Sequence, residues 1–313
     1  MNNLHIYKDL SNEDYHSKKD YISSSFVKSV FKHSVADALK PLEVSDALIE
    51  GDQFHTLMES ELDFNKRFFV AEKPDDTAII KEILTTPKKD GTFYTERGVT
   101  MTNKYKAWVA EHTPIVPEGK MLVWSDKFEQ YNRMKESLLS NPMYLDRTKN
   151  TDQFNAEWSF FTKKNHVITF YDSHLYEYAD EFGEIIVLDF SEFSDLKFRV
   201  RPDQFQMRGD EIIWIDDWKT CRDASLYAFK GDLYKLAYDL QAIFYSGVMG
   251  VDPELFTFWA VQKEKPYSSA PYNLKPDTIH RAIIKLHKTL KRIKLWKETG
   301  YDGLQESLQE NLI

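Results

Sequence analysis

Apolar and polar positions repeat with two different periods along this chain. Between residues 154 and 218 they alternate in short runs, which predicts strands because successive side chains of a strand point to opposite faces. These strands are expected at residues 154–161, 167–171, 185–190, 196–203 and 211–218, and one more at residues 255–262.

Elsewhere apolar residues recur every three or four positions, as on one face of a helix. Helices are expected at about residues 44–61, 103–112, 125–139 and 232–249. Residues 1–150 are therefore predicted to be mostly helical, and residues 151–313 to hold strands enclosed by helices. This order favours an α/β fold, with a mixed central sheet flanked by helices and a helical N-terminal part.

The two predicted strands around Arg208–Gly209–Asp210 carry the most chemistry in the chain. That triplet has the composition of a tight turn, so an antiparallel hairpin is expected. In the second strand Asp217 and Lys219 share a face, and the hairpin can bring Asp203 to the same place. Two carboxylates can hold Mg²⁺ or Mn²⁺, and a neighbouring lysine can orient a water or stabilise charge on a phosphate. The alternative is a surface salt bridge at the end of a strand.

Two pairs of helical positions can join such a site. Gly51 and His55 are four residues apart on one face, so the missing side chain of Gly51 would admit another backbone and His55 could bind a metal or a phosphate. Gln241 and Tyr245 have the same spacing on a polar and aromatic stripe of the predicted helix 232–249. The alternatives are a core histidine with ordinary partners, and the boundary of an amphipathic helix, where tyrosine is common.

In chain order these positions form the pattern GxxxH, PD, DxK and QxxxY, with Pro202–Asp203 as the PD pair and Asp217–Trp218–Lys219 as DxK. The combination resembles the RecB-like branch of the PD-(D/E)XK nuclease superfamily, which has a restriction-endonuclease-like core. The resemblance implies a Mg²⁺ site, in which Mn²⁺ can substitute, formed by His55, Asp203 and Asp217, with the backbone carbonyl of Trp218 as an extra ligand. It assigns catalysis to Lys219 and DNA contacts to Gln241 and Tyr245. The step of 14 residues from Asp203 to Asp217 is somewhat long for this family.

Three further segments, at residues 21–28, 124–142 and 261–267, are loosely similar to exodeoxyribonuclease VIII-like (RecE-type) proteins of phages and prophages. This similarity implies a metal-dependent exonuclease that digests linear double-stranded DNA from its ends, 5′→3′, in phage-type recombination. It also implies a ring-shaped homo-oligomer and a single-strand annealing protein as partner. The acidic insert at residues 172–195 matches no motif of these proteins.

Length and composition narrow the class of protein. The 313 residues suit one large domain or two small ones, and we expect a single nuclease domain over residues 1–313. No apolar run reaches the roughly 18 residues that cross a bilayer, and no secretory signal is visible, so a cytoplasmic protein of a bacterium or phage-infected cell, without a membrane partner, is expected. Cys221 is the only cysteine, which excludes an intramolecular disulfide and an iron–sulfur cluster held by cysteines of this chain.

The net charge of −9 counts against non-specific coating of nucleic acid, which needs clustered lysine and arginine. A local basic surface remains compatible with it. Arg199 and Arg201 flank Asp203 and are expected to contact DNA, and a basic helix near residues 283–297 is either a solvated face or a strip along the DNA backbone. Glu157, on the first predicted strand, is either an outer metal ligand or an exposed strand residue.

Three other functions compete with the exonuclease. A nuclease of the same fold could nick DNA or cut flaps, and only dependence on DNA ends separates the two. A non-catalytic DNA-binding module that retains the fold would have no need of the Asp203, Asp217 and Lys219 set. An iron oxygenase needs a second histidine ligand, and no HxD pattern lies near either aspartate.

Overall fold

A computed structural model describes residues 3–41, 44–149, 155–156 and 158–301 of the chain. The chain divides into two compact units, a larger one of Met1–His55 and Met134–Ile313 and a smaller one of Thr56–Arg133. Two helices, α4 (Asp46–Glu59) and α9 (Ser125–Leu139), continue from one unit into the other. The single nuclease domain over residues 1–313 stays a prediction.

The larger unit is built on a mixed five-stranded sheet. Across the sheet its strands are β12 (Ser269–Asn273), β11 (Phe256–Gln262), β10 (Glu211–Cys221), β9 (Gln204–Arg208) and β4 (Asn155–Ala156). β10 and β11 are parallel, and the other neighbours are antiparallel. The predicted α/β fold with a mixed central sheet flanked by helices is therefore confirmed.

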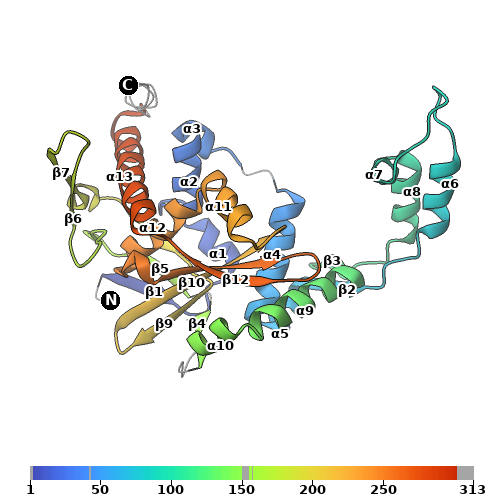
Figure 1. Ribbon diagram of the computed structural model, residues 1–313, viewed down its shortest axis with the longest axis horizontal. Helices are drawn as coiled ribbons and strands as arrows, with labels where there is room; N and C mark the ends of the chain where they lie inside the picture. Colours follow the sequence, from blue (N-terminus) through green and yellow to red (C-terminus); the bar gives the residue numbers. More distant parts are fainter. Residues whose placement is uncertain (1–2, 42–43, 150–154, 157, 302–313) are drawn as a thin grey trace. The chain divides into compact units, whose positions relative to one another are not determined.

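Two helices make the crossover that the parallel pair requires. α11 (Leu226–Lys235) and α12 (Tyr238–Met249) connect β10 to β11, and α2 (Ser24–Lys32) and α13 (Pro276–Thr299) pack against α12 (Figure 1). The sequence predicted one helix over residues 232–249. The structure has two because Ala237 adopts a left-handed conformation, with φ of 52°, which a right-handed helix cannot continue through.

The close packing of α12 depends on Gly247. A Cβ at this position would lie 2.6 Å from Cγ2 of Ile168 and 2.7 Å from Cζ of Phe170. Residues 167–171 were predicted to be a strand, but they form irregular chain with one bridge from Phe170 to Ser173. The reason is that Thr169 donates its backbone N–H to the carbonyl of Gly247 on α12 instead of to a strand.

A second sheet joins the N-terminal segment to the chain that precedes Asp203. Its antiparallel strands are β1 (Leu4–Tyr7), β5 (Ser159–Thr162) and β8 (Arg199–Val200). The predicted strand 196–203 is thus reduced to β8, and the first strand of the hairpin is β9, which begins after Asp203. The insert at residues 172–195 holds a hairpin of β6 (Leu175–Ala179) and β7 (Ile185–Asp189).

Short helices complete the larger unit. They are α1 (Asn12–Ser17), α3 (Val35–Ala38), α10 (Pro142–Thr148), and the 3₁₀ turns η1 (Phe190–Phe193) and η2 (Pro253–Leu255).

The smaller unit contains four further helices, and three of them, α6 (Thr77–Thr85), α7 (Glu96–Val99) and α8 (Asn103–His112), surround a small apolar core. Its other elements besides α4 and α9 are α5 (Glu61–Arg67), β2 (Phe68–Ala71) and β3 (Met121–Trp124). β2 and β3 pair in parallel, and Ile79, Ile83 and Val99 are buried together. Within the described ranges of both units, no helix is both long enough and apolar enough to cross a membrane.

Candidate active site

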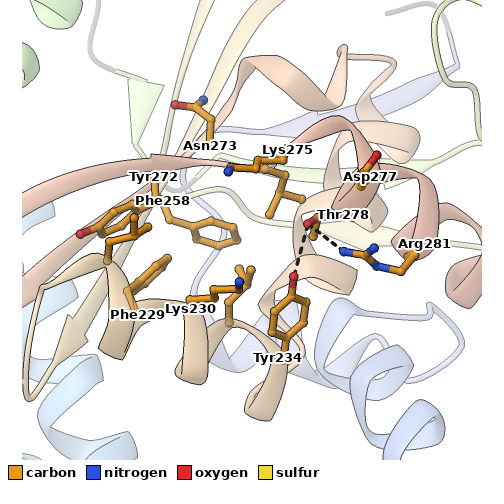
Figure 2. Close-up of a pocket in the computed structure, with 13 residues that line it drawn as sticks. Phe229, Lys230, Tyr234, Phe258, Tyr272, Asn273, Lys275, Asp277, Thr278 and Arg281 are labelled. Carbon is orange, nitrogen blue, oxygen red and sulfur yellow. Dashed lines mark hydrogen bonds between the residues drawn. The ribbon is translucent and has the colours of Figure 1, made fainter.

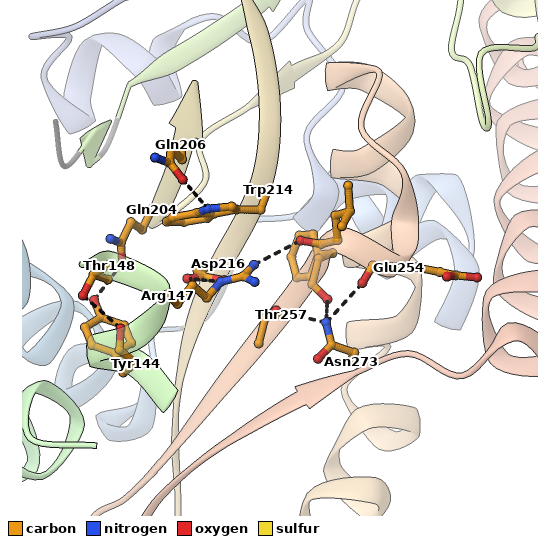
Figure 3. Close-up of polar contacts among 12 residues, drawn as sticks. Tyr144, Arg147, Thr148, Gln204, Gln206, Trp214, Asp216, Glu254, Thr257 and Asn273 are labelled. Atoms are coloured by element: carbon orange, nitrogen blue, oxygen red, sulfur yellow. Dashed lines mark hydrogen bonds and ion pairs between the residues drawn. The ribbon is translucent and has the colours of Figure 1, made fainter. Parts of the chain in front are cut away.

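The central strand β10 presents two neighbouring carboxylates to opposite faces of the sheet. Asp217 and Lys219 lie on one face and form an ion pair. Asp216 lies on the other face, where its two oxygens are 2.8 and 3.0 Å from Nε of Arg147 (Figure 3). Burial raises the pKa of Asp216 to about 6 in spite of Arg147. Of these two aspartates, only Asp217 is placed to serve a site on the Lys219 face.

Asp203 reaches the same place from the chain just before β9. Its Oδ2 accepts a hydrogen bond from the backbone N–H of Trp218 at 2.6 Å, and its Oδ1 lies 3.2 Å from Nδ1 of His55. Burial acts to raise the pKa of Asp203, but the charges of His55 and Lys219 and these hydrogen bonds outweigh it, so the pKa is lowered. Asp203 is therefore held as a carboxylate beside the Asp217–Lys219 pair.

The pKa values of Asp217 and Lys219 move in the same direction for different reasons. Burial raises the pKa of Asp217, and the nearby charge of Asp203 raises it further, while Lys219 opposes both. Burial acts to lower the pKa of Lys219, but the charges of Asp217, Tyr238 and Asp203 raise it overall. Lys219 is therefore an ammonium at neutral pH, which supplies positive charge and hydrogen bonds rather than a base.

His55 joins the site through Asp203, and Gly51 plays a different part from the one expected. Burial acts to lower the pKa of His55, but the charge of Asp203 and the contact with it raise the pKa overall. A Cβ on Gly51 would meet no atom within 4 Å, so no backbone approaches there and that expectation is wrong. Gly51 instead forms part of the wall of an open cleft.

Gln241 and Tyr245 on α12 contact the protein rather than the cleft. Nε2 of Gln241 donates to Oδ1 of Asp217 at 2.7 Å, and the hydroxyl of Tyr245 donates to the backbone carbonyl of Arg201 at 3.1 Å. Their exposed fractions are 5% and 7%. They therefore position Asp217 and the chain before Asp203, and the predicted DNA contacts find no support in this geometry.

Lys28 is a site residue that the sequence did not reveal. It lies on α2, and its Nζ donates to Oε1 of Gln241 at 2.8 Å. Burial and the nearby charge of Lys219 lower its pKa to about 7. A signal was present in the polar stripe of Ser25, Lys28, Ser29 and Lys32, which have the three- and four-residue spacing of one helical face.

An open cleft of about 770 Å³ lies beside these residues in the larger unit. Trp218, Lys219 and His55 lie at its wall together with α2 and α4. One acidic side chain, Asp52, lines the cleft. Seven lysine and histidine side chains also line it: His16, Lys28, Lys32, His33, His55, Lys219 and Lys263. Basic side chains therefore outnumber acidic ones in this lining, although the chain as a whole carries a net charge of −9.

Arg199 and Arg201 are not among the residues that line this cleft, although Arg201 donates to Oδ1 of Asn12, which is. The guanidinium of Arg199 donates to the backbone carbonyls of Tyr15 and, at 3.0 Å, Lys18, and only 7% of the residue is exposed. Arg201 donates to the carbonyl of Leu10 and to Oγ of Ser159, both at 2.8 Å. Both arginines thus fasten the N-terminal segment to the second sheet, and the structure does not bring them to the phosphate path that the sequence suggested.

The basic helix expected near the C-terminus is α13, and many of its charges are paired within the protein. Lys285 pairs with Asp239 at 2.8 Å, and His287 lies 2.8 Å from Glu192. Lys294 pairs with Asp195 at 3.4 Å. These pairs indicate that α13 is docked on the rest of the larger unit. Of the two interpretations of its basic face, a solvated face is simpler than a strip along the DNA backbone.

The donor set near Asp217 fits a hard divalent cation. Within the described parts of the chain, no three or more histidine, cysteine, aspartate or glutamate side chains form a ready metal cluster. Mg²⁺ commonly binds through one or two carboxylates together with water and substrate phosphates, so Asp203 and Asp217 satisfy its requirement. The pKa of Asp203 is lowered and that of Asp217 is raised, and a bound cation would favour the ionised form of both groups. Glu157 lies outside the described residues, and the carbonyl of Trp218 stays a predicted ligand.

The fold and this site define an α/β domain of the PD-(D/E)XK type. The model of the family described as "PDDEXK-like domain of unknown function (DUF3799)" matches residues 23–302, and the chain belongs to this family. The chain is also similar to a crystal structure of a candidate exonuclease from Eubacterium rectale, at 14% sequence identity over 93% of this chain and 87% of that chain, with a TM-score of 0.45. Comparison with curated proteins gave no match.

Proposed function

We propose that this chain is a metal-dependent DNA nuclease that hydrolyses phosphodiester bonds. The observation that supports this most is the meeting of Asp203, Asp217 and Lys219 beside a cleft with basic walls. Membership of the PDDEXK-like family supports it independently. The lysines that line this cleft can attract a polyanion.

Each residue has a defined task in this proposal. Asp203 and Asp217 would hold Mg²⁺ or Mn²⁺, with His55 and the carbonyl of Trp218 as further ligands. When bound, the ion supplies Lewis acidity toward the scissile phosphate. The ammonium of Lys219 donates hydrogen bonds to the phosphate and stabilises the charge that develops on it.

Residues of α2 and α12 keep this arrangement in place. Gln241 donates to one oxygen of Asp217, and Lys28 donates to Gln241, so the carboxylate has a fixed orientation. Tyr245 holds the carbonyl of Arg201, two residues before Asp203. Ser25, Ser29 and Lys32 at the cleft wall are placed to contact the DNA backbone.

We further propose that the enzyme is an exonuclease that degrades linear double-stranded DNA in the 5′→3′ direction. A ring-shaped homo-oligomer and a single-strand annealing protein as partner belong to the same proposal. The similarity to exodeoxyribonuclease VIII-like (RecE-type) proteins in the sequence supports these finer statements.

Incubation with linear and covalently closed circular duplex DNA, in Mg²⁺ or in EDTA, tests the proposal. We expect Mg²⁺-dependent loss of the linear DNA alone, with Asp217→Asn as the inactive control. Linear substrates labelled at the 5′ or the 3′ end then report the direction. Cutting of the circle would instead favour the endonuclease, and binding without hydrolysis the non-catalytic module.

A further inference from the structure

A second cavity, of about 320 Å³, lies in the larger unit at the start of α13 (Figure 2). Side chains of α11, β11, β12 and the first turns of α13 line it, and none of the residues assigned above to the metal or to catalysis does so. Its volume is at the lower end of the range of about 300–1,000 Å³ that is usual for small-ligand sites. The cavity therefore suits one compact group better than an extended segment.

One side of the cavity is a rigid aromatic wall. The rings of Phe229 and Tyr272 are stacked, with centroids 4.7 Å apart and an interplanar angle of 15°, and Phe258 lies 5.9 Å from Phe229. The hydroxyl of Tyr272 donates to the carbonyl of Ala224 at 2.6 Å, which fixes its ring. The wall is thus formed before any ligand arrives. Phe229 and Phe258 are 2% and 0% exposed, so the partly exposed ring of Tyr272 is the one that a flat apolar group can contact most fully, with little ordering of the protein.

The mouth of the cavity is positively charged. Lys230, Lys275 and Arg281 line it, and Asp277 is the only acidic side chain among the lining residues (Figure 2). Lys230 and Lys275 are exposed, and neither forms an ion pair within the described part of the chain. The pKa of Tyr234 at this mouth is lowered by its hydrogen bond to Thr278 and by the charges of Arg281 and Lys230. An anionic group would be attracted to this end.

Two aromatic rings separate this cavity from the active site. The ring of Tyr238 lies 4.9 Å from Nζ of Lys219, and it also stacks on Phe229 with centroids 6.3 Å apart. Phe229 is itself a lining residue of the cavity. A ligand in the cavity would therefore lie close to the DNA-cleaving site without entering it.

We propose that this cavity binds a nucleoside phosphate, with the base against the aromatic wall and the phosphate at Lys230 and Lys275. A base offers a flat apolar face, and the phosphate two to three acceptor oxygens for the two ammonium groups. The choice of a nucleotide over another aromatic anion rests on the proposed DNA nuclease function. The source is either a free mononucleotide released by cleavage or a nucleotide within a single strand.

Calorimetry in EDTA with three proteins tests the site and keeps the active-site metal out of the measurement. The proteins are the wild type, Lys230→Glu/Lys275→Glu, and the control Lys235→Glu/Lys297→Glu, which makes the same charge change on α11 and α13 at residues that do not line the cavity. The probes are deoxythymidine monophosphate, thymidine and pentathymidylate. We expect the cavity variant to lose about tenfold or more in affinity for the phosphate-bearing probes, and the control to match the wild type.

The probes distinguish a free nucleotide from a nucleotide within a strand, and an added peptide tests a different class of ligand. Binding of the monophosphate assigns a free nucleotide, and binding of pentathymidylate alone assigns a nucleotide within a strand. Equal affinity of all three proteins for both probes would overturn the proposal, as would thymidine binding as tightly as its phosphate. Tighter binding of an acidic Leu-Glu hexapeptide at the same lysines would assign the cavity to a peptide instead.

Hydrolysis of a short linear duplex by the same proteins separates this inference from the proposed function. We expect the cavity variant to keep its rate on this substrate within about twofold, as for an ordinary surface substitution. Absence of hydrolysis in the wild type would contradict the nuclease, whereas it would leave the measured nucleotide affinities and their dependence on Lys230 and Lys275 unchanged.

Discussion

At the scale of single residues, the carboxylate of Asp217 is oriented by a relay of two hydrogen bonds. Lys28 donates to Gln241 at 2.8 Å, and Gln241 donates to Asp217 at 2.7 Å. Because a carboxylate can only accept, Asp217 selects the amide orientation that turns the nitrogen of Gln241 toward itself and the oxygen toward Lys28. The relay connects α2 to the site through residues that are 213 positions apart in sequence.

Removing either donor of the relay should weaken metal binding by a similar amount. For Lys28→Met and Gln241→Leu we expect a loss of about 10–100-fold in Mg²⁺ affinity, the usual effect of removing a partner behind a metal ligand. The double variant should be little worse than either single one, because both break the same relay. Calorimetric Mg²⁺ titration measures this, with Lys235→Met as control. Additive losses would show that the two residues act separately.

Substitutions of Asp217 and Lys219 should have different effects on Mg²⁺ binding and on the rate of DNA hydrolysis. Asp217→Ala removes a carboxylate ligand, so Mg²⁺ binding and DNA hydrolysis should both be lost. Lys219→Ala should keep Mg²⁺ binding and lose hydrolysis by about 10²–10³-fold, as expected when a donor to developing charge is removed. Near-wild-type hydrolysis by either folded variant would remove these residues from the site.

At the scale of elements, the sequence could predict what depends on neighbours along the chain. The turn at Arg208–Gly209–Asp210 and the shared face of Asp217 and Lys219 follow from local composition and strand alternation, and both are present. The partners of Arg199 and Lys28 lie far along the chain, at Tyr15 and Gln241, so no local pattern could assign them. Buried polar residues such as Gln241 look the same in a sequence whether they contact DNA or another side chain.

Arg147 ties α10 to β10, and its removal should destabilise the fold in a pH-dependent way. Arg147→Met would leave Asp216 buried without its charged partner, at a cost of about 3–5 kcal/mol in the free energy of unfolding. The pKa of Asp216 is already raised to about 6 with Arg147 present, and it should rise further without it. Because the pKa of Asp216 is higher in the folded than in the unfolded state, the free energy of unfolding falls as the pH rises from the unfolded-state pKa through the folded-state pKa. The loss should thus be larger at pH 8 than at pH 5, measured by urea unfolding, and a pH-independent loss would contradict this account.

Two glycines allow a matched test of helix packing. Gly247→Ala should lower the free energy of unfolding by about 1–3 kcal/mol, because its Cβ would overlap Ile168 and Phe170. Gly231→Ala on α11 meets no atom within 4 Å and should leave stability unchanged or raise it by up to about 1 kcal/mol. Denaturant unfolding of both variants checks the contrast, and equal effects would mean that α12 can shift to accept the methyl group.

At the scale of the whole molecule, the proposed DNA affinity has to come from a local surface, because the net charge of −9 repels a polyanion. We propose the cleft beside Lys219 as that surface, since Arg199 and Arg201 hold the N-terminal segment. The original expectation placed the phosphate path at these two arginines. The path proposed here instead follows α2, whose residues line the cleft.

The dependence of DNA affinity on salt concentration distinguishes a phosphate path along α2 from one at Arg199 and Arg201. Lys32→Glu should weaken binding and reduce the slope of log affinity against log salt by about one, since fewer counterions are released. Arg201→Gln should lower stability through its lost contacts and leave the slope unchanged. Binding measured in Ca²⁺, with Lys297→Glu as control, tests both, and the reverse result would restore the arginine path.

The alternation of Asp216 and Asp217 on β10 makes the chemistry of this protein a matter of strand register. If the strand slid by one residue, Asp216 would face the side of the sheet that Asp217 and Lys219 now occupy, and both of those residues would turn toward the side of Arg147. Ile215 and Asp216 pair with β11 on one side and with β9 on the other, and this pairing opposes such a slide. The irregularity in the pairing with β9 lies earlier, between Ile212 and Trp214. An insertion in the turn or at this irregularity can therefore be absorbed before the aspartates. One inserted residue between Ile215 and Asp217 would instead dismantle the proposed site although every one of its residues is still present.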